Sequence, residues 1–125
     1  MGDPRRATGR SAENICAHHL SRRGWRILTR NWRIRAGEVD LIALAGSTLV
    51  FVEVKSGHVG ALRGPPAPAL AVGPHKQRRL RRLAEAWLAG PGRNLAFRDT
   101  RFDVVGVVFG RGGEIAVYDH IEDAF

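Results

Sequence analysis

Apolar and polar residues alternate along the chain in a pattern that predicts two helices and five strands, in the order α-β-β-β-α-β-β. Apolar side chains return every three or four residues in the helical segments, whereas the strand segments are rich in β-branched and aromatic residues. Helices are expected over 11–23 and 74–89, and strands over 25–34, 37–45, 48–55, 101–109 and 114–118. This order predicts an α/β or α+β domain in which helices cover a central sheet.

The segment 37–55 has the pattern of a β-hairpin. Its two apolar runs flank Gly46-Ser47, and a Gly-X pair suits a two-residue type II′ turn. That turn sets the register, so that residue 45 pairs with residue 48 and the pairing continues outward from there. Because side chains alternate between the two faces of a strand, one face of the hairpin should be wholly apolar. Its expected members are Val39, Leu41, Ala43, Val50, Val52 and Val54.

Charged residues interrupt the other face at the open end of the hairpin. In the predicted register Asp40 faces Glu53, and Glu38 faces Lys55. Residues that face each other directly have Cβ atoms about 4.5–5.5 Å apart, so Asp40 and Glu53 would be like charges in contact. One carboxyl could be protonated, Lys55 and an arginine could neutralise the pair, or a divalent cation could bind between them. The cation explains more, although Glu38 and Lys55 could equally form a plain cross-strand ion pair.

Chain length limits the protein to one domain, because 125 residues are enough for a single core. Residues 1–10 are expected to form a flexible basic arm, and residues 11–125 a single domain. Within that domain, residues 57–73 are rich in glycine and proline and are expected to form a long mobile loop.

Charge and composition point to a polyanionic partner. The net charge is +8, which favours nucleic acid first and an anionic membrane surface second, while a basic surface can also simply aid solubility. A single cysteine, Cys16, excludes an internal disulfide and fits a reducing cytosol, so a cytoplasmic location is expected. No apolar run approaches the length of about 20 residues that a membrane span needs.

Basic residues are concentrated in the second predicted helix. Five of them follow one another there without acidic residues between them, which favours contact with phosphate groups over a plain solvated face. These predicted nucleic-acid-binding residues are Lys76, Arg78, Arg79, Arg81 and Arg82.

Four motifs together resemble a known family. The chain is similar to the YraN-like family of small bacterial proteins, which in turn resembles the PD-(D/E)XK nucleases and, among them, the Holliday-junction resolvases. The likeness runs from about residue 9 to Phe125. Its motifs are G-E-V-D-L-I (37–42), V-F-V-E-V-K (50–55), P-H-K-Q-R-R-L (74–80) and R-F-D-V-V (101–105).

The resemblance implies a restriction-endonuclease-like core, with a central mixed β-sheet flanked by helices, and a nuclease centre that uses Mg²⁺ or Mn²⁺. Carried over position by position, Asp40 and Glu53 match the metal-binding carboxylates, and Lys55 matches the catalytic lysine. Glu13 matches a glutamate of the first helix that completes the metal site. Gln77 matches a polar position of the second helix near the catalytic centre.

Two functions therefore remain open. The first is a metal-dependent endonuclease that hydrolyses phosphodiester bonds in DNA, with branched DNA among its substrates. The alternative is a non-catalytic nucleic-acid-binding module or adaptor that has the nuclease-like fold. The resolvase-like relatives further suggest a homodimer, and an adaptor would act together with repair or recombination proteins.

Overall fold

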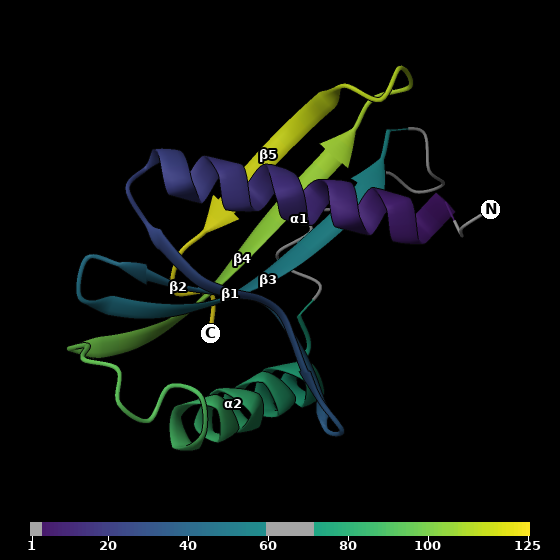
Figure 1. The fold of residues 1–125 in the computed structure, drawn as a ribbon. Coiled ribbons are helices and arrows are strands. Elements are labelled where there is room, and N and C mark those ends of the chain that lie inside the picture. Colours follow the sequence, from purple (N-terminus) through teal and green to yellow (C-terminus); the bar gives the residue numbers. More distant parts are fainter. Residues whose placement is uncertain (1–3, 60–71) are drawn as a thin grey trace.

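The computed structural model describes residues 4–59 and 72–125, and it confirms the predicted order of elements (Figure 1). The chain is α/β: two helices flank a mixed five-stranded sheet whose strands lie in the order β1-β2-β3-β4-β5. Strands β3 and β4 run parallel, and each other neighbouring pair is antiparallel. The elements are α1 (Pro4–Arg22), β1 (Arg26–Ile34), β2 (Gly37–Ala45), β3 (Thr48–His58), α2 (Pro74–Ala89), β4 (Asp99–Phe109) and β5 (Ile115–Ile121).

Two boundaries differ from the sequence-based expectation. Helix α1 begins at Pro4 and not near Ser11, so most of the expected arm 1–10 is helical. Proline is favourable in a first helical turn, and its fixed φ allows the helix to start there. Strand β3 continues to His58, because it pairs in parallel with β4 as far as Phe109. The rest of the loop expected at 57–73 lies mainly outside the described residues.

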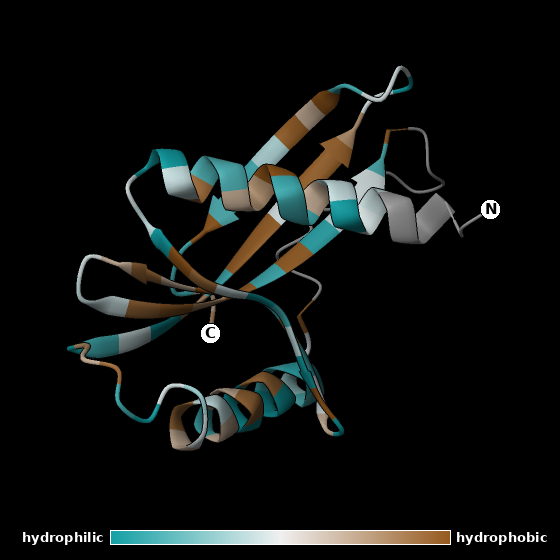
Figure 2. Cartoon of the chain, in the orientation of Figure 1, coloured by the Kyte–Doolittle hydropathy of each residue, from teal (hydrophilic) through white to brown (hydrophobic). Residues whose placement is uncertain are grey.

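The sheet has a separate apolar core on each face. Helix α1 covers one face and α2 covers the other, as Figure 1 shows, and Figure 2 shows the apolar bands along the central strands between them. Cores of this kind are held together mainly by burial of apolar side chains, at roughly 25 cal/mol per Å². The α1 side contains Ala12, Cys16, Leu20, Leu41, Ala43, Val50, Val52, Val105 and Val107, and the α2 side contains Val39, Ile42, Leu49, Phe51, Leu80, Leu83, Trp87 and Phe102. No described helix is long and apolar enough to cross a lipid bilayer.

The hairpin register is confirmed near the turn and wrong at its open end. Gly46 has φ of 62°, as the first central position of a type II′ turn requires. The β2–β3 ladder then runs as predicted from Ala45–Thr48 to Leu41–Val52, where it ends. Beyond Leu41, β2 stays paired with β1, while β3 stays paired with β4. The two strands of the hairpin therefore diverge at Asp40.

This divergence changes two expected neighbours. Val39 was expected on the same face as Leu41, yet it packs in the core on the α2 side, with Ile42. Glu38 was expected opposite Lys55, but it lies opposite Arg33 of β1 and forms an ion pair with it. In both cases the reason is that the end of the sheet where β1 and β2 meet leaves β3 and lies beside α2 (Figure 1).

The close approach of β2 to α2 depends on Gly37. Its φ is 147°, a value that residues with side chains rarely adopt. A Cβ atom at this position would lie 3.3 Å from Leu83 Cδ1 and 3.4 Å from Arg79 Cδ. Glycine therefore allows the start of β2 to lie directly against the helix, where Arg79 and Glu38 line the same small cavity.

A buried carboxylate joins β4, β5 and the C-terminal residues. Asp103 is fully buried and accepts hydrogen bonds from Arg101 Nε (2.8 Å), the Asp123 amide (3.0 Å) and His120 Nε2 (2.8 Å). Arg23 Nη1 lies 3.1 Å from His120 Nδ1. Arginine can only donate, so Nδ1 accepts from Arg23 while Nε2 donates to Asp103. Burial alone would raise the pKa of Asp103, but its bonds to His120 and Arg101 outweigh burial and hold it below the ordinary value.

We expect Asp103→Asn to lower the free energy of unfolding by about 3 kcal/mol, because it leaves the charge of Arg101 without its buried partner. Urea denaturation at pH 7 measures this loss, with the exposed Glu85→Gln on α2 as the matched control. Because the pKa of Asp103 is lower in the folded chain, the wild type should lose its advantage as the pH falls through 4 and below. A cost no larger than that of Glu85→Gln would contradict the role assigned to Asp103.

Candidate active site

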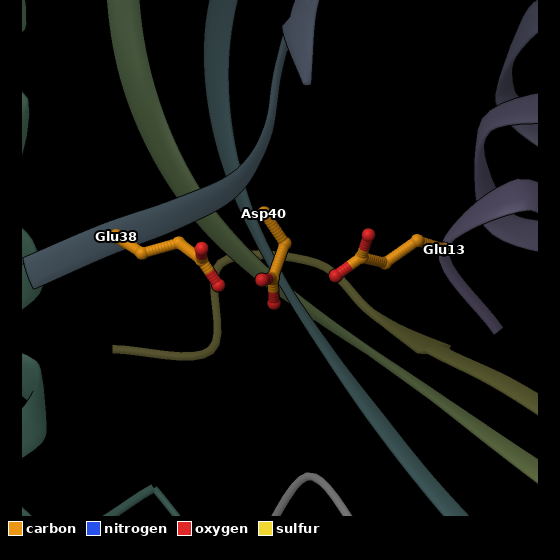
Figure 3. Close-up of side chains that lie close together, drawn as sticks. All are labelled: Glu13, Glu38 and Asp40. Carbon is orange, nitrogen blue, oxygen red and sulfur yellow. The ribbon is translucent and has the colours of Figure 1, made fainter. Parts of the chain in front are cut away.

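Three carboxylates converge where β2 leaves β3. Glu13 of α1 and Glu38 and Asp40 of β2 each place an oxygen within 4.8 Å of the other two, and Figure 3 shows their side chains pointing toward one another. Glu13 reaches this point because α1 buries its adjacent residues Ala12 and Cys16 against the sheet. Glu38 and Asp40 lie two residues apart on β2, and both reach this point where β2 leaves β3.

Asp40 lies at the centre of this acidic cluster and is fixed to β3. Its Oδ2 accepts a hydrogen bond of 2.8 Å from the Val54 amide, and the residue is only 8% exposed. Burial, together with the negative charges of Glu53, Glu13 and Glu38, raises the pKa of Asp40 to about 7 against the lowering effect of the Val54 bond. Near neutral pH this carboxyl therefore exchanges readily between its neutral and charged forms.

Glu13 is held by a neighbour that the sequence did not suggest. Burial raises its pKa, as does the charge of Glu38, whereas a hydrogen bond with the Asn31 side chain and the charge of Arg30 lower it. Asn31 stands in the middle of β1 with φ of 52°, a left-handed conformation that asparagine tolerates better than most residues. This local backbone turn directs an amide toward the carboxylate.

Glu53, the second predicted metal ligand, lies beside the cluster and already has a cation. It is 8% exposed, and Lys76 Nζ lies 2.8 Å from its Oε1. The metal ligands predicted from the sequence were Asp40, Glu53 and Glu13; the group within mutual reach instead contains Glu38 in place of Glu53. Glu53 remains next to it, because a cavity of about 220 Å³ is lined by Gly37, Glu38, Asp40, Glu53, Lys76, Arg79 and Leu80.

Two lysines share the site, and they are the only lysines in the sequence. Burial lowers the pKa of Lys55, and the positive charge of Lys76 lowers it further against the carboxylates of Glu53 and Asp40. For Lys76 burial acts in the same direction, but the ion pair with Glu53 outweighs it and raises the pKa. One lysine is therefore a firm counter-ion, and the other is the more easily deprotonated.

None of the remaining predicted residues belongs to the group of three carboxylates, although Arg79 lines the cavity beside it. Gln77 donates its side-chain amide to the Val72 carbonyl at 2.9 Å, so this group supports the start of α2. Of the predicted phosphate-binding arginines, Arg79 lines the small cavity, whereas Arg81 stacks over the Phe102 ring, 5.0 Å from its centroid. Arg82 is exposed, and Arg78 lies 2.9 Å from His75 Nδ1. Contact of this helix with nucleic acid stays a prediction.

The donor set fits a magnesium or manganese ion. Both ions prefer hard oxygen ligands, and one to three carboxylates together with water form a usual protein site. Glu13, Glu38 and Asp40 supply such oxygens, and a cation beside them would offset the burial and the negative charges that raise the pKa of Asp40. A site made only of carboxylates suits these two ions, which assist phosphoryl transfer, better than it suits zinc, because zinc favours sulfur and nitrogen ligands.

Comparison with known proteins gives a consistent result. The family model described as uncharacterised protein family UPF0102 matches residues 12–107. A UPF0102 protein of Rhodococcus jostii (strain RHA1) is 45% identical over 119 residues, which make up 95% of this chain and 96% of the relative. UPF0102 proteins of Anaeromyxobacter dehalogenans and Mycobacterium avium are 49% and 50% identical, over 89% and 82% of this chain and 79% and 78% of theirs.

We expect Asp40→Asn to make the metal-free protein more stable at pH 8. The unfolded chain releases the Asp40 proton near pH 4, whereas the folded chain holds it to about pH 7. The free energy of unfolding of the wild type should therefore fall as the pH rises between these values. Asparagine is neutral and can still accept the Val54 bond, so it should stabilise the protein at pH 8 by about 2–4 kcal/mol.

Denaturation in EDTA at pH 5 and pH 8 measures this difference. Asp119→Asn, a change of the same kind in β5 away from the acidic cluster, should leave the pH dependence unchanged. If Asp40→Asn is as pH-dependent as the wild type, the charge of Asp40 is not the source of the instability.

Proposed function

The chain belongs to the uncharacterised protein family UPF0102, and we propose that it is a Mg²⁺-dependent endonuclease that hydrolyses phosphodiester bonds in DNA. One observation carries this proposal: three carboxylates from two elements converge on one point, beside Glu53 and two lysines. Like charges are costly to bury, so their assembly at one place indicates a site maintained for a positive ligand. The same proposal includes branched DNA as a substrate and Mn²⁺ as an alternative to Mg²⁺.

Each residue has a distinct role in the proposed reaction. Glu13, Glu38 and Asp40 would hold the ion, and Glu53 would border it. Such an ion, when bound, lowers the pKa of a water molecule and offsets charge that develops on the phosphoryl oxygens. Binding of a cation also keeps Asp40 in its charged form, which burial otherwise opposes.

Lysine at these two positions supports catalysis over simple anion binding. All other Lys/Arg positions of the chain are arginine, which does not lose its proton in proteins. Lys55, whose pKa is lowered by burial and by Lys76, can accept a proton from the attacking water or donate one to the leaving oxygen. Lys76 holds Glu53 in place at 2.8 Å.

A second function is favoured by a specific observation. Glu53 and Glu38 already pair with Lys76 and Arg33, so cations of the chain itself neutralise part of the cluster. A nucleic-acid-binding module or adaptor needs only this internal neutralisation and no bound metal ion. The two functions differ in whether a divalent ion binds at Asp40 and whether the bound DNA is cleaved.

We expect the wild type to cleave linear, flap or four-way-junction DNA with Mg²⁺ or Mn²⁺. Asp40→Asn and Lys55→Ala should each reduce the rate by at least about 10²-fold, because they remove an ion ligand and a proton-transfer group. Glu85→Gln is the matched control, since it removes an exposed charge on α2. DNA that is bound but not cleaved by the wild type would favour the binding module.

We further expect Glu38→Gln to weaken Mn²⁺ binding at least tenfold, because its oxygen lies within reach of both other ligands. Electron paramagnetic resonance of Mn²⁺ measures binding without any need for activity. Glu53→Gln should have the smaller effect, since Lys76 holds that carboxylate. The reverse order would place the ion between Asp40 and Glu53, and unchanged binding by Asp40→Asn would contradict the metal site.

A further inference from the structure

A second and larger cavity lies on the other side of Glu38. It has a volume of about 660 Å³ and is lined by Gly9, Arg10, Glu13, Asn31, Arg33 and Glu38. Glu38 lines both this cavity and the small one that contains Asp40 and Glu53. The acidic cluster is therefore open in two directions, toward α2 and toward the α1–β1 side.

The two openings have basic walls of similar chemistry. On the α2 side, Lys76 and Arg79 line the small cavity. On the α1–β1 side, Arg10 and Arg33 line the large one. This arrangement suits the backbone of a nucleic acid. The phosphate that reacts would lie at the carboxylates, and the phosphates on either side of it would each contact an arginine of one basic wall.

Both arginines of the larger cavity have capacity for a phosphate. Arg10 is exposed, and its side chain forms no hydrogen bond or ion pair with any residue in the described part of the chain. Arg33 uses Nε and Nη2 to donate to Glu38 Oε2, and its side chain is 76% exposed. A guanidinium has five N–H donors, so Arg33 can bind a phosphate while it remains paired with Glu38.

We propose that the cavity between α1 and β1 is a phosphate-binding groove in which Arg10 and Arg33 hold the DNA backbone on one side of the scissile bond, while Arg79 holds it on the other. This rests on the proposed function for the identity of the polyanion. The groove adds to that function the path of the DNA strand, which crosses the acidic cluster from the α1–β1 side to α2. It also assigns to substrate two arginines that lie outside the basic helix.

The test is binding of a fluorescently labelled DNA duplex and single strand, measured by anisotropy in EDTA over a series of salt concentrations. Arg10→Ala should weaken binding and lower the slope of log K against log salt by about 1, since one phosphate contact is lost. Because Arg33 also neutralises Glu38, Arg33→Ala is made in a Glu38→Gln background and compared with Glu38→Gln alone. The same loss of about 1 in slope is expected there.

Arg26→Ala and Arg111→Ala are the matched controls, because both residues are exposed and line neither cavity. Both controls should retain the wild-type slope. Controls that change the slope as much as Arg10→Ala would show a diffuse charge effect and overturn the groove. An unchanged slope for Arg10→Ala, with intact DNA binding by the wild type, would overturn the groove and leave the proposed function standing. No DNA binding by the wild type, either in EDTA or with a divalent ion present, would overturn both.

Discussion

The hydrogen bond from the Val54 amide to Asp40 Oδ2 is the contact on which the geometry of the site depends. The ladder between β2 and β3 ends at Leu41–Val52, and just beyond it a side-chain oxygen takes the place of a backbone acceptor. A buried amide needs a partner, so β3 tolerates the departure of β2 only because this carboxylate satisfies it. The same bond holds Asp40 at the fork between the strands.

The fork then sets the positions of the other carboxylates. Once β2 leaves β3, Glu38 faces Arg33 of β1 and turns toward Glu13, whereas Glu53 remains on β3 opposite α2. A hairpin paired to its end would have put Asp40 against Glu53 and Glu38 against Lys55. The divergence thus replaces these two cross-strand pairs with one cluster of carboxylates around Asp40, and Glu53 forms its ion pair with Lys76 instead.

Most of the fold follows from local sequence signals, and the site follows from them only in part. Gly46-Ser47 fixes the hairpin register near the turn, and Gly73-Pro74 fixes the start of α2, because each needs only adjacent residues. The end of the β2–β3 ladder has no such signal, since it depends on competition between β1, β3 and α2 for β2. For this reason the place of Asp40 among neighbouring carboxylates could be predicted, whereas the presence of Glu38 instead of Glu53 within mutual reach of Glu13 and Asp40 could not. Asn31 gave no signal, because its role depends on a left-handed φ inside a strand.

Electrostatic balance links the cluster to the basic surface around it. Glu53 and Glu38 are each paired with a cation of the chain, whereas Asp40 accepts a hydrogen bond from a backbone amide, and burial together with the neighbouring carboxylates raises its pKa to about 7. A divalent ion at Asp40 would draw Glu38 into its coordination and thereby compete with Arg33 for the same carboxylate. An arginine relieved of its partner binds phosphate more strongly, so ion and DNA would favour each other's binding. By thermodynamic linkage that coupling has to be equal in both directions. A chain with a net charge of +8 can therefore contain an acidic cluster among its arginines. Without ligands, ion pairs with the chain's own cations neutralise part of the cluster, and a bound ion and DNA would replace the partners in those pairs.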